Sequence, residues 1–480
     1  MEESLKSKTA KGILWGATGS GGMQLLNLFF GIFLSRILTP HDYGIVGSLA
    51  IFSTLAGIFS ESGFVLAIVN KKEATRDDYN ALFWFTVGMS LTIYVILWLC
   101  APLIAGFYHQ PEMVGLSRFL FLGFLFSATA SAPAAYMFRN LLVKQRTQAQ
   151  LIALTIAGVV GVCCALGGLS YWSIAIQTVS YVACNSLLLW KISRWRPQLS
   201  FHPGALKGML SFSLKQLVVS VFTVANTNIF AMLLGHFYNM RITGYYTQGN
   251  KWTSMGLGTI SGTINSIGQP VLRQANDTEE RVRRVFRKLL RFTCFVSFPC
   301  MFGMAIIARE LIVVAVTSKW LASAGVMQIL CIGSAFLPIG VLCGNLFNSL
   351  RRPAIYMWNT IAIGSVQLIA LYVTYRFGLE RMLIVYSAIN AGWIMIWLIF
   401  VSRHIGISYW GLLLDIVPYL VISGGVMALT CFALRSVENL WLSLILKIIM
   451  AAAIYSLLMW RLRSAVFFEA LGYLRGKIRG

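Results

Sequence analysis

Residues 81–106 read ALFWFTVGMSLTIYVILWLCAPLIAG, an unbroken apolar stretch without one charged side chain. About 20 apolar residues in a helix are enough to cross the hydrocarbon core of a bilayer. Stretches of this kind recur along the whole chain, so we predict about fourteen membrane-spanning helices. They are expected at residues 12–36, 44–69, 81–106, 115–137, 149–168, 170–190, 209–236, 243–271, 289–309, 324–349, 354–376, 381–402, 411–434 and 440–460.

The composition excludes a soluble enzyme. Hydrophobic residues make up 58% of the 480, charged residues only 11%, and the mean hydropathy is +0.73, which is too apolar for a surface in water. No stretch shows the alternation of an outer-membrane barrel strand, so the predicted fold class is all-α, a polytopic helical bundle. All nine cysteines fall in apolar stretches without metal-ligand spacing. We therefore expect no catalytic residues, no metal site and no cofactor.

Basic residues outnumber acidic ones by 39 to 16. In a soluble protein this excess would suggest a nucleic-acid partner, but here the lysines and arginines lie in short runs between apolar stretches. One set of alternate connections, which includes both termini, carries 28 of the 39, and the opposite set carries eight. Cytoplasmic connections are enriched in Lys and Arg. We therefore predict that both termini are cytoplasmic and that the chain binds no nucleic acid.

A weak internal repeat appears at an offset of 200 residues. Leu34-Ser35-Arg36 and Gly44 correspond to Leu234-Gly235-His236 and Gly244. Six predicted spans separate the copies, so both halves share one orientation and predict two six-helix lobes related by an axis along the membrane normal. The expected parts are residues 1–195 for the first lobe, 196–405 for the second, and 406–480 for two accessory helices and a cytoplasmic tail.

The predicted eighth span carries a polar face. Residues three and four apart share one side of a helix, and small polar residues alone are typical of helix packing. A lysine inside a span costs about 2.5–3.5 kcal/mol on insertion scales, so Lys251 favours a water-filled cavity between the lobes. The face comprises Gly244, Thr247, Lys251, Ser254, Gly258, Ser261 and Asn265, and the first span adds Gln24 and Asn27.

Four other charged residues near predicted spans have two interpretations each. Lys215 is either a cavity cation or a side chain that reaches the headgroups from the end of its span. Glu61 forms either a structural ion pair or a site for a coupling proton, and Arg36 either anchors the outer end of the first span or partners an acid. Lys447 lies outside both lobes, where it either reaches the membrane surface or contacts an anionic lipid headgroup.

Proline and glycine positions predict local irregularities. Pro133 and Pro338 should interrupt their helices at comparable places. The glycine-rich run of residues 16–22 lacks the Lys-Ser/Thr of a phosphate loop and lies in a span. We interpret this run as close helix packing and exclude nucleotide binding.

Several short segments resemble the polysaccharide-transporter branch of the MOP exporter superfamily, and the colanic acid exporter type in particular. The resemblance covers nearly the whole chain. Its segments are LSRILTPHDYG at residues 34–44, ESGF at 61–64, AIVNKKE at 67–73, LFWF at 82–85, NTN at 226–228 and GYY at 244–246.

The resemblance implies a flippase that moves polyprenyl-pyrophosphate-linked oligosaccharide from the cytoplasmic to the outer leaflet of the inner membrane by alternating access. The family's basic cavity fits Lys251 and Lys215, and amides such as Gln24, Asn27 and Asn228 would bind sugar hydroxyls. Ser254 and Asn265 complete the substrate-binding set on the same polar face. The expected partners are the lipid-linked oligosaccharide, membrane lipid and the polysaccharide biosynthesis machinery, with the chain itself a monomer.

Two other functions remain open from the sequence. A cation-coupled multidrug exporter of the same superfamily would need an essential carboxylate, for which Glu61 is the candidate, although the first span has no acidic residue. A membrane glycosyltransferase or polymerase would need a large outer loop or a catalytic loop with carboxylates. The outer connections are all short, which disfavours this second alternative.

Overall fold

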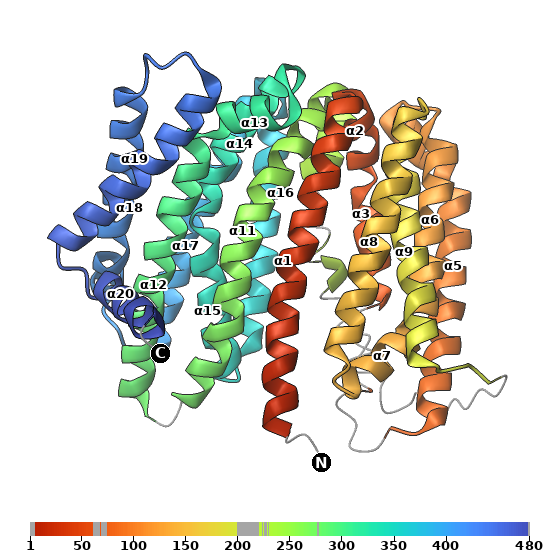
Figure 1. Cartoon of the computed structure of the whole chain (residues 1–480), viewed down its shortest axis with the longest axis horizontal. Coiled ribbons are helices and arrows are strands. Elements are labelled where there is room, and N and C mark those ends of the chain that lie inside the picture. The colour runs from red at the N-terminus through yellow and green to blue at the C-terminus, as the bar shows by residue number, and fades with distance from the viewer. Residues whose placement is uncertain are drawn as a thin grey trace. The chain divides into compact units, whose positions relative to one another are not determined.

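The computed structural model describes residues 5–60, 68, 74–198, 220–222, 224, 228, 230–275 and 278–478. The ordered elements of these residues are all helices, so the predicted all-α class is confirmed. The chain divides into two compact units, Met1–Gly244 and Tyr245–Gly480 (Figure 1). Glu61 and Lys215 lie outside the described residues. The predicted boundary at residue 196 stays a prediction.

The first unit is built from helix pairs, some adjacent in sequence and others far apart. Helix α1 packs on α8, α8 on α9, α5 on α6, and α6 on α9. In Figure 1 the yellow helices α8 and α9 lie side by side. The elements are α1 (Leu5–Ile37), α2 (Pro40–Ser48), α3 (Ala50–Ser60), α5 (Arg76–Tyr108), α6 (Met113–Thr129), α7 (Ser131–Arg139), α8 (Val143–Leu166) and α9 (Trp172–Ser193).

The second unit contains the remaining helices, beginning with α11, whose first five residues belong to the first unit. Helix α12 is its hub, because it packs on α14, α15 and α18. The elements are α11 (Met240–Gln274), α12 (Glu279–Ile306), α13 (Ala308–Val316), η1 (Ser318–Trp320), α14 (Leu321–Ser334), α15 (Leu337–Ser349), α16 (Pro353–Thr374), η2 (Tyr375–Phe377), α17 (Leu379–Ile405), α18 (Tyr409–Ala433), α19 (Leu440–Arg461) and α20 (Ala465–Ile478).

Among the described residues, nine helices are long and apolar enough to cross a membrane, and the bent pair α6 and α7 would make a tenth. Helices α1 and α11 have 33 and 35 residues, and at about 1.5 Å per residue they are also long enough. Both contain too many polar residues to count among the nine apolar helices. The predicted spans 44–69 and 209–236 extend outside the described residues, so the count of fourteen stays a prediction.

Both predicted proline interruptions are confirmed. Helices α6 and α7 meet at a 41° bend, and Pro133 lies in the first turn of α7. Helices α14 and α15 are separated at Ala335 and Phe336, and Pro338 lies in the first turn of α15. Proline is tolerated in a first turn, where its missing N–H has no intrahelical partner to lose.

The repeat has a counterpart in a backbone contact within the first unit. A Cβ atom at Gly44 would lie 1.7 Å from the carbonyl oxygen of Met240, and one at Gly244 would lie 1.7 Å from that of Pro40. The two contacts are reciprocal, because these pairs are equivalent at the offset of 200. Only glycine permits such close approach of two backbones.

Candidate functional site

A cavity of about 430 Å³ lies in the first unit beside α1, α7 and α8. Its wall combines apolar side chains with hydroxyl, amide and guanidinium groups. The lining residues are Gly19, Ser20, Met23 and Gln24 of α1, Met137 and Phe138 of α7, Leu142, and Val143, Arg146, Thr147 and Gln150 of α8. A polar cavity beside α1 and α8, which are both long enough to cross a membrane, is a candidate binding surface, because lipid alone would disfavour such groups.

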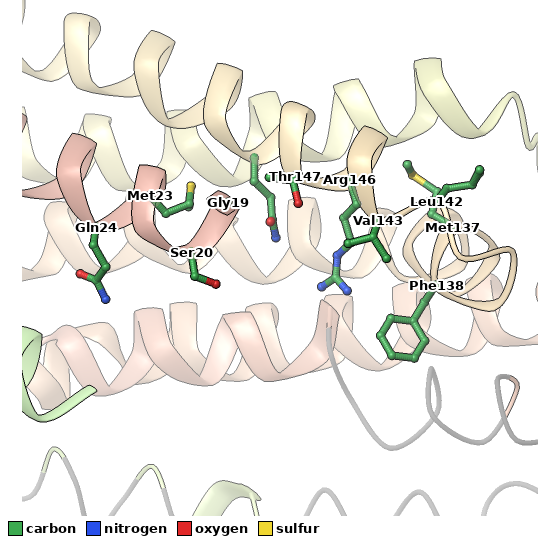
Figure 2. A pocket seen from close by; sticks show the side chains of 11 residues that line it. Gly19, Ser20, Met23, Gln24, Met137, Phe138, Leu142, Val143, Arg146 and Thr147 are labelled. Atoms are coloured by element: carbon green, nitrogen blue, oxygen red, sulfur yellow. The ribbon is translucent and has the colours of Figure 1, made fainter. Parts of the chain in front are cut away.

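The polar side chains converge because helix spacing puts them on matching faces. Ser20 and Gln24 lie four residues apart on α1, and Arg146 and Gln150 lie four apart on α8. Figure 2 shows Ser20, Gln24 and Arg146 projecting to the same side of their two helices.

Close packing of α1 on α8 brings these faces together. A Cβ at Gly19 would lie 2.2 Å from Thr147 Cγ2, and one at Gly158 would lie 2.3 Å from the Phe30 ring. The interpretation of the glycine-rich run as helix packing is confirmed at Gly19 and at Gly22, whose own Cβ would lie 3.2 Å from Leu151. The glycines therefore set the width of the cavity.

Arg146 is the charged cavity residue that sequence reasoning missed. The charge pattern places it among the basic residues of a connection, but α8 begins at Val143, six residues before the predicted span. Its guanidinium carbon lies 5.9 Å from the Phe138 ring centroid, and the side chain is partly buried. The neighbouring Lys144 is exposed and lies instead over the Trp15 ring at 5.1 Å. The four-residue spacing of Arg146 and Gln150 was the available signal.

Within the second unit, α11 has one packed face and one polar face. A Cβ at Gly249 would lie 2.8 Å from Val326, and one at Gly256 would lie 2.3 Å from Met304, so these glycines bring α11 against α14 and α12. Exposed residues on the other side include Ser254, Gly258, Gly262 and Asn265, at spacings of three and four. Of the predicted face of α11, Ser254, Gly258 and Asn265 are exposed. Thr247, Lys251 and Ser261 are partly buried, and Gly244 is buried.

Lys251 lies at one end of this polar face. It is partly buried, and among the described residues it makes neither an ion pair nor a hydrogen bond. The Ser254 hydroxyl donates to Asn250 Oδ1 at 3.5 Å, and Asn345 donates from Nδ2 to Asn265 Oδ1 at 3.1 Å. A lysine without a partner among the described residues, on a helix long enough to cross a bilayer, is available to bind an anion.

The remaining predicted residues are dispersed. Asn27 shares the face of Gln24 but does not line the cavity. Asn228 donates its amide to the backbone carbonyl of Val224 at 3.0 Å, and Arg36 is exposed in the last turn of α1. In the described part of the chain, no group of three or more His, Cys, Asp or Glu residues could hold a metal ion.

Lys447 requires a correction, because its expected surface position or headgroup contact does not match its surroundings. Its Nζ lies 2.5 Å from Glu310 Oε1, with 13% and 7% of the two side chains exposed. Nζ also donates to the Ile306 carbonyl at 3.2 Å, and the Ser443 hydroxyl donates to the same Glu310 oxygen at 3.1 Å. The low-dielectric surroundings favour pairing of the two charges.

Helices long enough to cross a bilayer, a polar cavity with an arginine, and a lysine without an ion pair among the described residues are typical of a multi-span membrane transporter. The chain belongs to the polysaccharide biosynthesis protein family, whose profile matches residues 33–325. The resemblance to polysaccharide transporters of the MOP superfamily is thereby confirmed.

Two named relatives match most of the chain. The lipopolysaccharide biosynthesis protein WzxC of Escherichia coli K12 is 24% identical over 73% of this chain and 71% of its own length. The teichuronic acid biosynthesis protein TuaB of Bacillus subtilis 168 is also 24% identical, over 68% of each chain.

Solved structures share the fold. The lipid II flippase MurJ in an inward closed conformation gives a TM-score of 0.71 at 13% identity, covering 94% of this chain and 99% of its own. An inward-facing multidrug resistance transporter of the MATE family gives 0.63 at 14% identity, covering 80% of this chain and 94% of its own. At these identities the likeness concerns the fold alone.

Proposed function

We propose that this protein is a flippase that moves polyprenyl-pyrophosphate-linked oligosaccharide from the cytoplasmic to the outer leaflet of the inner membrane. Membership of the polysaccharide biosynthesis family supports the substrate class. The observation that carries the mechanism is Lys251, a cation without a protein partner among the described residues, on α11, a helix long enough to cross a membrane. The family and its relatives indicate a transporter, and we assign no catalytic residue.

The substrate's headgroup explains why such a surface is needed. An unpaired anion in hydrocarbon would cost tens of kcal/mol in the Born limit. Lys251 and Arg146 would attract the pyrophosphate. We retain Lys215 as a third cation that would bind it during transport. Sugar hydroxyls would bind the remaining polar groups, which are Gln24, Asn27, Gln150, Asn228, Ser254 and Asn265.

Transport by alternating access would expose the headgroup first to the cytoplasm and then outside. We propose fourteen spans, as two six-helix lobes and an accessory pair, with both termini cytoplasmic. An interior-negative potential drives anions outward with about 2.3 kcal/mol per charge per 100 mV. The potential therefore supplies a driving force without a nucleotide. Glu61, with Arg36 as the candidate counter-charge, stays the candidate for ion coupling.

The proposal is tested by charge removal in a strain that lacks the gene. Arg146→Gln and Lys251→Gln should each lower surface polysaccharide by about tenfold or more, equal to at least about 1.4 kcal/mol of lost stabilisation. Mass spectrometry should show accumulation of the lipid-linked intermediate. Lys144→Gln, which removes a charge two residues from Arg146 but outside the cavity, is the matched control and should export normally.

Immunoblots of the membrane fraction must show equal protein levels for all variants. Lys251→Arg keeps the charge and should restore most of the export lost in Lys251→Gln. Wild-type export by both charge-removal variants at normal protein level would contradict the cationic surface. Export lost equally in Lys144→Gln would contradict the assignment of Arg146.

Multidrug export is the second candidate, because the fold is shared with the multidrug resistance transporter of the MATE family. The fold does not separate the two functions, but the sequence relatives are polysaccharide biosynthesis proteins. Drug susceptibility of the deletion strain distinguishes them. A flippase predicts unchanged resistance together with loss of surface polysaccharide.

A further inference from the structure

A second polar cavity, of about 580 Å³, lies in the second unit at the start of α12. The loop of residues 406–408 and the start of α20 complete its wall. Five cations on α12 line it: Arg283, Arg284, Arg287, Lys288 and Arg291. In Figure 1 the dark blue helix α20 lies across the lower part of α12.

A buried carboxylate holds two of these cations in place. Asp415 of α18 has 3% of its side chain exposed, and it accepts hydrogen bonds from Arg287 Nε and Arg291 Nε at 2.6 and 2.7 Å. The two arginine side chains are themselves 40% and 43% exposed. One carboxylate therefore orients two guanidinium groups, while part of each faces the cavity. Such orientation lowers the entropy lost when an anion binds.

The cavity keeps a positive excess after pairing. Lys288 pairs with Glu469 at 2.7 Å, and Arg284 lies 3.7 Å from Glu280. All four of these side chains are more than half exposed, and exposed pairs contribute little and exchange partners readily. With Glu279 beside Arg283, four carboxylates face five cations. A phosphate can therefore recruit Arg284 and Lys288 without breaking a buried pair.

The cavity lies where α12 changes from polar to apolar. After Arg291 no charged residue follows until Arg309, so the charged segment ends where the membrane-crossing part begins. Helix α20 packs against this boundary through Phe467, whose ring lies 6.4 Å from Phe295. Phe468 of α20 is 44% exposed. A basic cavity beside exposed aromatic surface at this depth suits a charged lipid headgroup.

We propose that this cavity binds the phosphate of an anionic phospholipid, with the acyl chains in the bilayer beside α20. Guanidinium groups match phosphate oxygens in geometry and charge. Arg287 and Arg291 form the oriented part of the site, and Arg284 and Lys288 the adaptable part. The site is separate from Arg146 and Lys251, and it does not depend on which substrate the protein transports.

The test is lipid-dependent thermal unfolding of the full-length protein in detergent. Phosphatidylglycerol should raise the melting temperature saturably, whereas phosphatidylcholine should not. Arg284→Gln/Lys288→Gln removes two exposed charges from the cavity and should weaken the apparent phosphatidylglycerol affinity by about fivefold or more. The matched control, Arg273→Gln/Arg281→Gln, removes two exposed charges outside the cavity lining and should bind as wild type.

A soluble arm separates lipid from free phosphate. Inorganic pyrophosphate is titrated alone and then in the presence of phosphatidylglycerol, and only the lipid should give the full stabilisation. Unchanged phosphatidylglycerol affinity in the cavity variant would overturn the proposal. Equal loss in the control variant would also overturn it, by showing general charge attraction. Full stabilisation by pyrophosphate alone would refute the lipid assignment. None of these outcomes bears on the flippase proposal, which is tested at other residues.

Discussion

The two lysines that the sequence places deep inside described spans differ in their surroundings. Lys447 pairs with Glu310, whereas Lys251 has no ion pair or hydrogen bond within the described residues. The sequence could not show that Lys447 is paired, because Glu310 lies 137 positions away. Only the packing of α13 against α19 brings the two residues together. A span lysine becomes a functional candidate once no nearby carboxylate neutralises it.

Lys447→Met should destabilise the protein, because it leaves Glu310 buried without its counter-charge. Glu310 Oε2 is already buried without a hydrogen-bond partner in the described structure, so little compensation is available. Breaking a buried pair typically costs about 3–5 kcal/mol. Thermal unfolding in detergent should show a clearly lower melting temperature for the variant.

The double variant Lys447→Met/Glu310→Gln removes both charges and should recover most of the loss. Lys144→Met, at an exposed position, is the control and should melt as wild type. A single variant as stable as the wild type would show that the pair contributes nothing to folding.

Arg146 shows a limit of reading charge patterns alone. Arg146 lies near the start of a predicted span, so it can both mark the topology and line a cavity. Counting basic residues registers only the topology signal. The apolar run of that span starts later than α8 itself, because Gln145, Gln148 and Gln150 belong to the helix. Polar first turns of this kind are invisible to a search for apolar stretches.

At the scale of the element, the contact of α1 with α8 decides the width of the candidate cavity. Both helices carry glycine where the other presents a side chain, and a Cβ at Gly19 would lie 2.2 Å from Thr147 Cγ2. Thr147 is buried and lines the cavity. A small change at this contact should therefore shift the position of Arg146 in the cavity wall.

Gly19→Ala should push α1 away from α8 and impair export. Overpacking of a filled contact typically costs about 1–3 kcal/mol. Gly21→Ala is the matched control on the same helix, because nothing lies within 4 Å of its Cβ. Surface polysaccharide and membrane protein level should both fall in Gly19→Ala and stay normal in Gly21→Ala. Thr147→Ala added to Gly19→Ala removes the clashing methyl and should restore part of the loss; no restoration would contradict the packing account.

Most elements were predictable because the bilayer demands long apolar helices, and the prolines marked both helix breaks. The elements that escaped prediction are those that apolar length does not reveal. Helix α13 is nine residues long, and α20 lies in the expected cytoplasmic tail although its Val466 is buried and its Phe467 packs on α12. Short helices of this kind depend on tertiary packing.

At the scale of the whole molecule, solved structures share the fold, and the proposed function requires cationic polar surfaces that would bind an anionic headgroup. The sequence predicted the class well, since membrane solvation and charge distribution act along the whole chain. The candidate substrate-binding residues were only partly predictable. Gln24, Lys251, Ser254 and Asn265 were named from the sequence, whereas Arg146 and Gln150 required the helix boundary and the α1–α8 contact.

Flipping in proteoliposomes tests the central claim most directly. A polyprenyl-pyrophosphate oligosaccharide with a fluorescent sugar is placed in both leaflets, and an impermeant reductant destroys only the label outside. Wild-type protein should make the inner-leaflet pool reducible at least about tenfold faster than protein-free liposomes, with Arg146→Gln/Lys251→Gln close to the protein-free rate. An inner pool that stays protected with wild-type protein, or is lost equally fast with the double variant, would contradict the account.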